Sequence, residues 1–184
     1  MGNVVRIISK SSSSIGDWFH WIYQFFASGE WTLAVDVQLA KGLPPLPRVG
    51  IEFPVKDIKS QITYFGRGPL ENYPDRQTAA LLGHYDADIK DFYTPYIFPS
   101  ESGLRTDCRR AELAGFTVSG DFHLGVSRVN QHNLTAAKHT CDLVEDACLY
   151  VRLDAEHMGV GGDDSWSPSA HPEYLLSDKH YRYK

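Results

Sequence analysis

The stretch from Trp31 to Leu39 constrains the fold most, because its residues alternate strictly in character. The odd-numbered residues are large and apolar, whereas the even-numbered ones are small or polar. Successive side chains of a β-strand point to opposite faces, so this alternation predicts a strand with one buried face. Gly42, Pro44 and Pro45 follow and end the pattern, since proline cannot continue a strand ladder.

Several further short segments have strand character, and glycine or proline separates most of them. They are residues 49–53, 62–65, 116–118, 122–126, 148–153 and 173–176. Two windows, residues 77–82 and 131–139, are each suited to a turn or two of helix, and no clear pattern precedes about residue 20. Many short strands with Gly/Pro turns predict an all-β fold, either an antiparallel sandwich or a barrel.

Composition and charge argue against several kinds of partner. The net charge is −5 with no basic stripe, so we expect no nucleic acid. No stretch approaches the ~20 apolar residues that span a bilayer, and the first residues are too short for the apolar region of a signal peptide. Three cysteines form no CxxC pair, which suggests neither a disulfide framework nor a zinc site and favours a cytoplasmic location.

The segment from Met158 to Pro168 is the most informative candidate for a binding site. Its glycines, Gly161 and Gly162 among them, permit positive φ angles, so we expect a sharply turned loop that Pro168 stiffens. Such a loop would present Trp166, whose indole plane matches the apolar face of a sugar ring. The residues alone favour the alternative, in which Trp166 is a core tryptophan beside a tight turn, because large apolar residues mostly pack.

Asp163 and Asp164 invite comparison with the carboxylate pair of a glycosidase. Retaining glycosidases need two carboxyl groups ~5 Å apart across the bound sugar, whereas adjacent loop residues usually point in different directions. We therefore expect both aspartates to support the loop by accepting hydrogen bonds from backbone N–H groups. The histidines show no HExxH clustering and no GxSxG motif occurs. We predict no catalytic residue and no metal ligand in this chain.

Three segments, taken together and in order, resemble a known family. They are residues 68–76 (GPLENYPDR), 93–101 (YTPYIFPSE) and 157–168 (HMGVGGDDSWSP). They look like the C-terminal domain of the bacterial β-galactosidases of glycoside hydrolase family two, and the similarity extends from about Tyr23 to the C-terminus.

The resemblance implies a fold, a function and a division of labour. The fold would be an antiparallel supersandwich similar to that of galactose mutarotase, encoded in some bacteria as a separate small subunit. The enzyme would hydrolyse terminal β-D-galactosides such as lactose. Its catalytic glutamates and its Mg²⁺ and Na⁺ ions belong to a (β/α)8 barrel that this chain lacks. The position that contributes a tryptophan to the rim of the sugar site matches Trp166.

The chain also departs from the family pattern. Residues 1–20 do not match it and are treated as an N-terminal segment of unclear origin, with residues 21–184 as the sandwich domain. We expect this sandwich to be incomplete at its ends, and hence to self-associate or to bind a barrel-bearing large chain, because open strand edges and apolar surface are normally covered. Two other functions stay open: a stand-alone carbohydrate-binding module and a mutarotase-like epimerase.

Overall fold

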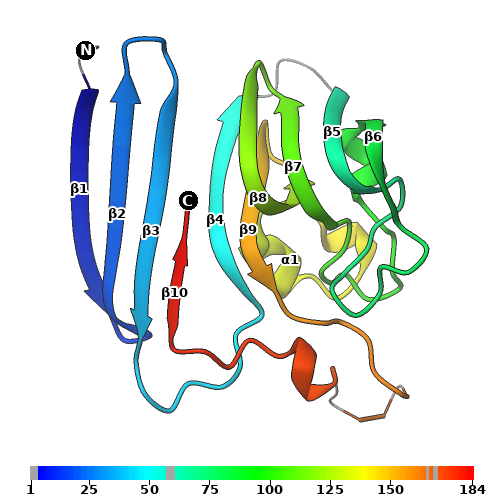
Figure 1. Cartoon of the computed structure of the whole chain (residues 1–184). Helices are drawn as coiled ribbons and strands as arrows, with labels where there is room; N and C mark the ends of the chain where they lie inside the picture. Colours follow the sequence, from blue (N-terminus) through cyan, green and yellow to red (C-terminus); the bar gives the residue numbers. More distant parts are fainter. Residues whose placement is uncertain (1–3, 57–60, 165, 168–169) are drawn as a thin grey trace. The chain divides into compact units, whose positions relative to one another are not determined.

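The computed structural model describes residues 4–56, 61–164, 166–167 and 170–184, which form two antiparallel sheets (Figure 1). The strands are β1 (Val4–Ser13), β2 (Gly16–Phe26), β3 (Trp31–Leu39), β4 (Arg48–Lys56), β5 (Gln61–Gly68), β6 (Leu81–Asp88), β7 (Arg105–Leu113), β8 (Phe116–Ser127), β9 (Cys148–His157) and β10 (His180–Tyr183). The short helices are η1 (Ile89–Phe92), α1 (Gln131–Ala136), η2 (Thr140–Asp142) and η3 (Pro172–Tyr174). The prediction of an all-β antiparallel fold is confirmed; likeness to galactose mutarotase stays a prediction.

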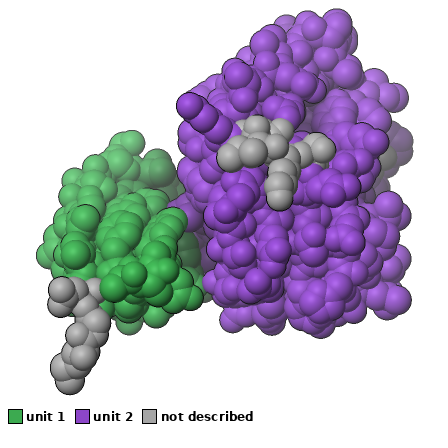
Figure 2. Space-filling view, turned by 90° about the horizontal axis from the view of Figure 1, so that it is seen from above, with its two compact units in different colours: residues 1–47, 176–184 green, residues 48–175 purple. Residues whose placement is uncertain are grey.

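The chain divides into two compact units, coloured separately in Figure 2. Unit 1 comprises residues 1–47 and 176–184 and contains the four-stranded sheet β1-β2-β3-β10. Unit 2 comprises residues 48–175 and contains the six-stranded sheet β4-β9-β8-β7-β5-β6.

The core of unit 2 packs on its six-stranded sheet and explains why the alternating segments form strands. Its buried members come from β5, β7, β8, β9 and η1; they are Ile62, Tyr64, Ile89, Phe92, Cys108, Ala111, Leu113, Phe122, Leu124, Val126, Leu149 and Val151. On β5, for example, Ile62 and Tyr64 are buried while Gln61 and Thr63 are exposed. Cys108, Cys141 and Cys148 are all free thiols.

The strand expected from Trp31 to Leu39 occurs with those bounds as β3, and the other predicted strands, except residues 173–176, lie within longer ones. The sequence patterns do not predict β6, β7 or β10. Residues 116–118 and 122–126 belong to the single strand β8. β4 continues through Pro54. A central strand would not tolerate this proline, but β4 lies at the edge of its sheet, where one side of the strand needs no ladder hydrogen bonds. The helical window at 131–139 contains α1, and the window at 77–82 contains one turn, closed by Ala80 N donating to Gln77 O at 2.9 Å.

Two expectations about secondary structure are wrong. No element is predicted before about residue 20, yet β1 and β2 pair there from Val4↔Phe26 to Ser13↔Gly16. Their residues are exposed or half-buried and show little alternation, so tertiary pairing rather than pattern reveals them. Residues 173–176 are not a strand, since η3 occupies Pro172–Tyr174 and Pro172 preorganises its first turn.

Candidate functional site

The three segments that carry the family resemblance lie in unit 2 and are linked by polar contacts. Glu71 connects the first two, since its carboxylate accepts hydrogen bonds from Thr94 Oγ1 at 2.9 Å, from Gly103 N at 2.7 Å and from the Tyr96 hydroxyl. Arg76 adds an ion pair at 2.6 Å. Burial opposes ionisation of Glu71, but these hydrogen bonds outweigh it and lower its pKa. Glu71 is therefore an ionised connector between two loops.

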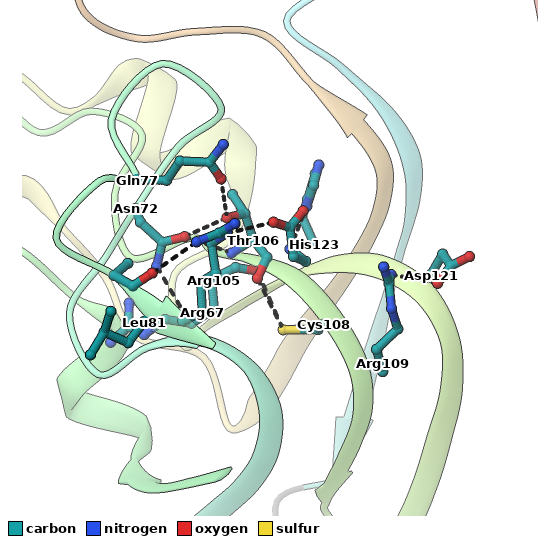
Figure 3. A network of polar contacts seen from close by, with 12 residues as sticks. Arg67, Asn72, Gln77, Leu81, Arg105, Thr106, Cys108, Arg109, Asp121 and His123 are labelled. Atoms are coloured by element: carbon teal, nitrogen blue, oxygen red, sulfur yellow. Dashed lines mark hydrogen bonds and ion pairs between the residues drawn. The ribbon is translucent and has the colours of Figure 1, made fainter. Parts of the chain in front are cut away.

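Asn72, the next residue, ties the first segment to β7 (Figure 3). It is almost fully buried, and its side-chain amide donates to Arg67 O and Leu70 O while its oxygen accepts from Thr106 N at 3.0 Å and from Thr106 Oγ1. All four hydrogen-bonding positions of the amide are thus used. This buried network has no signature in the sequence, because an asparagine beside a proline-containing turn usually indicates only the turn itself.

A second group of polar contacts lies around Asp107, on β7, and involves Arg67 and His123, both of which Figure 3 labels. Its carboxylate pairs with Arg67 Nε at 2.6 Å, and its backbone N–H donates to His123 Nδ1 at 3.2 Å. Burial lowers the pKa of His123 to about 4, so this histidine is a neutral hydrogen-bond acceptor at neutral pH. These contacts make the network a structural one.

A buried group of charges joins the second segment to β4 and β9. Glu101 pairs with Arg48 and, at 3.4 Å, with Arg152, and Arg48 lies 3.6 Å from Asp154. The side chains of Arg152 and Asp154 are 5% and 2% exposed, out of reach of a substrate. Burial raises the pKa of Asp154 to about 6, although Arg48 and Arg152 oppose the shift. Tyr73 donates to Glu101 at 3.4 Å, so the first segment also joins this group.

The third segment follows β9 as an exposed loop held by two aspartates. Asp75 accepts hydrogen bonds from Val160 N at 3.1 Å and Gly161 N at 2.7 Å. Asp164 accepts from Trp166 N at 2.8 Å and from Ser167 N at 2.7 Å. Asp75 thus joins the start of the loop to a distant part of unit 2, whereas Asp164 closes a local turn within the loop.

Asp163 points away from the contacts of Asp164, since its carboxylate pairs with His171 Nε2 at 2.9 Å. This pairing raises the pKa of His171. The two adjacent aspartates therefore bind different partners and do not form the facing pair that a glycosidase uses.

The glycines of this loop serve a different purpose from the one expected. Neither Gly159 nor Gly161 has a positive φ. A Cβ atom at these positions would instead lie 2.5 Å and 3.2 Å from Asp75 Oδ2. Close approach of a carboxylate, rather than a left-handed backbone, favours glycine here, more strongly at Gly159 than at Gly161. Gly162 is exposed, and the expected contribution of Pro168 lies outside the described residues.

Trp166 stands almost clear of the chain, with 87% of its surface exposed. A core tryptophan would be covered, so the reading of Trp166 as a packing residue does not hold for this chain. No described group of three or more His, Cys, Asp or Glu residues is placed to hold a metal ion. A cavity of about 30 Å³ beside Arg152 and Val126 has room for a water molecule but not for a sugar.

Comparisons with known proteins agree with the resemblance. A family model described as the β-galactosidase small chain matches residues 2–184, a range that includes the first 20 residues. The β-galactosidase of Psychromonas ingrahamii is 54% identical over 165 residues, that of Vibrio cholerae 49% over 164, and that of Pseudoalteromonas haloplanktis 47% over 164. The matches cover 89–90% of this chain and 16% of each relative.

None of the helices in the described part of the chain has the length and apolar character of a membrane span. The family model matches nearly the whole chain, and the three relatives are 47–54% identical to it. All three motif segments lie in unit 2. The chain belongs to the β-galactosidase small-chain family.

Proposed function

We propose that this chain is the part of a β-galactosidase that completes the rim of the sugar site, in an enzyme that hydrolyses terminal β-D-galactosides such as lactose. Catalysis would require a barrel-bearing polypeptide, joined covalently or bound as a larger subunit. A cytoplasmic location, which the three free thiols favour, accompanies this proposal.

The observation that carries the proposal is the exposure of Trp166 on an anchored loop. An indole that is 87% exposed keeps a large apolar surface in water, which is unfavourable unless a partner or ligand covers it. One face of a galactose ring is apolar, and stacking on an aromatic side chain suits that face. The hydrogen bonds of Asp75 and Asp164 to the loop backbone supply the rigidity that a binding contact needs.

The buried acids support the need for a partner. Asp154 and Glu101 are paired with arginines, and Glu71 is occupied by four donors. Glycoside hydrolysis needs one carboxyl group as acid and another facing it across the sugar, and these acids are committed elsewhere. The Mg²⁺ and Na⁺ of the complete enzyme do not fit the described residues, which offer no ligand cluster, so we assign those ions to the barrel-bearing part.

The test is galactoside hydrolysis with and without the barrel-bearing part. We expect the purified chain to hydrolyse no nitrophenyl galactoside above background, and activity to return when the chain is combined with a barrel-bearing polypeptide of the family. Turnover by the chain alone, after removal of contaminating enzyme, would contradict the proposal. Binding of galactose without any effect on hydrolysis in the mixture would favour a stand-alone carbohydrate-binding module instead.

A further inference from the structure

Asp75 makes contacts that the proposed function does not yet use. It lies in the segment of residues 68–76, and its two carboxylate oxygens each accept one backbone hydrogen bond from the Trp166 loop. Oδ1 binds Val160 N at 3.1 Å and Oδ2 binds Gly161 N at 2.7 Å. Hydrogen bonds from backbone amides to a carboxylate are among the stronger ones in proteins. Residues about 85 positions apart in sequence are thereby joined.

The loop is shaped to receive this carboxylate. A Cβ atom on Gly159 would lie 2.5 Å from Asp75 Oδ2 and 2.9 Å from Tyr174 Cβ, and one on Gly161 would lie 3.2 Å from Asp75 Oδ2. Both glycines have ordinary φ angles. The absence of side chains at these two positions therefore serves the approach of Asp75.

Backbone hydrogen bonds hold both the turn that carries Asp75 and the start of the loop that it contacts. The turn around it is closed by Arg76 N donating to Tyr73 O at 2.8 Å and by Tyr73 N donating to Arg76 O at 3.2 Å. Tyr73 is 1% exposed and anchors this turn in the interior of unit 2. On the loop side, Gly159 N donates to Tyr174 O at 2.9 Å. The carboxylate thus joins a rigid turn to the start of an exposed loop.

Trp166 has little packing of its own, so its place depends on the backbone that carries it. We propose that Asp75 is the positioning residue of the sugar-site rim: its carboxylate fixes the backbone at Val160 and Gly161 and so places Trp166 against the galactoside. This inference rests on the proposed role of Trp166 and adds the residue that sets its position.

The experiment compares Asp75→Ala, Asp75→Asn and a matched control in the chain assembled with its barrel-bearing partner. The control is Asp142→Ala, because Asp142 likewise accepts hydrogen bonds from two backbone amides, those of Lys138 and His139, in another loop of unit 2. We expect Asp75→Ala to raise KM roughly 3- to 10-fold with little change in kcat, since it removes charge-assisted hydrogen bonds that order a binding loop. Asp142→Ala should leave KM unchanged.

Two further measurements separate positioning from general stability. Asn retains one acceptor oxygen, so Asp75→Asn should keep one of the two bonds and give an intermediate KM. In a Trp166→Ala background, Asp75→Ala should raise KM little further. Asp75 acts on KM through the position of the Trp166 side chain, and this variant already lacks that side chain. In the chain itself, amide exchange at Val160 and Gly161 should accelerate in Asp75→Ala and not in Asp142→Ala.

The outcomes also separate this inference from the proposed function. Unchanged amide exchange, or an Asp75 effect on KM that adds fully to that of Trp166→Ala, would overturn the positioning role while leaving Trp166 in the sugar site. An unchanged KM in Asp75→Ala, with KM raised in Trp166→Ala, would do the same. An unchanged KM in Trp166→Ala itself would remove the site assignment, and the role of Asp75 would fall with it.

Discussion

Asn72 and Trp166 show two opposite roles that a single side chain has in the described part of the chain. Asn72 uses all four of its hydrogen-bonding positions inside unit 2, whereas Trp166 presents 87% of its surface. Nothing in the identity of either residue reveals which it will be, because asparagine is mostly exposed in proteins and tryptophan mostly covered. Both residues are therefore exceptions to the usual burial of their type.

Trp166→Ala should weaken binding without destabilising the chain. In the assembled enzyme it would remove one ring-to-sugar contact, worth ~1–2 kcal/mol, which corresponds to a KM raised roughly 5- to 30-fold. The thermal midpoint should change little, since no core cavity is created. KM and Tm are measured on the same variant. A large fall in Tm with an unchanged KM would show that Trp166 packs against something and does not bind sugar.

Strands and loops of unit 2 meet at positions where only glycine leaves enough space. Gly66 on β5 faces Cys108 on β7, and an added Cβ would lie 2.5 Å from its sulfur and 3.0 Å from its Cα. Gly66 also pairs in register with Gly83 on the edge strand β6, where an added Cβ would meet nothing closer than 3.4 Å. The two glycines are neighbours in the same sheet with opposite steric surroundings.

Gly66→Ala and Gly83→Ala therefore form a matched pair for testing the packing of the sheet. Overpacking at Gly66 should cost about 1–3 kcal/mol, or roughly 3–10 °C in Tm for a chain of this size. Gly83→Ala should be neutral or slightly stabilising, since alanine reduces the entropy of the unfolded chain. Thermal unfolding followed by circular dichroism measures both. Equal losses would mean that backbone flexibility, and not the contact with Cys108, requires glycine.

At the scale of the whole chain, the sheet of unit 1 has an exposed apolar patch at one end of one face. Register places Val5, Phe25 and Trp31 side by side on one face, with Ile7 and Tyr23 in the next row. The rings of Phe25 and Trp31 stack 6.2 Å apart, which confirms that they share this face. Val5, Ile7, Phe25 and Trp31 are 59%, 51%, 39% and 53% exposed, so they form a patch of a kind that proteins usually cover.

We expect the isolated chain to self-associate through this patch when no barrel-bearing polypeptide is present to cover it. Ile7→Lys should reduce the association because it places a charge in the patch. Ile8→Lys is the control, since Ile8 is equally exposed, at 50%, but lies on the opposite face of β1. Sedimentation or light scattering gives the molar mass of each. A monomer at high concentration would contradict this expectation, and equal effects of the two variants would show that the association does not depend on this face of the sheet.

The sequence by itself determined the all-β class and the family. Alternation from Trp31 to Leu39 predicted β3 with its observed bounds, because side chains on a half-buried strand must alternate. The three motif segments also predicted family membership, and they marked the loop that carries Trp166. These features are local, so a short stretch of sequence contains all that is needed to recognise them.

Only the tertiary structure decided how those segments act on one another. β1 and β2 lack a strong sequence pattern and are strands because they pair with each other. The glycines at 159 and 161 make room for the carboxylate of Asp75, about 85 positions away in the sequence. The links from Glu71 to Gly103, from Asn72 to Thr106 and from Asp75 to Gly161 are likewise non-local. Hydrogen bonds and close contacts depend on distances in the folded chain, and sequence spacing does not encode those distances.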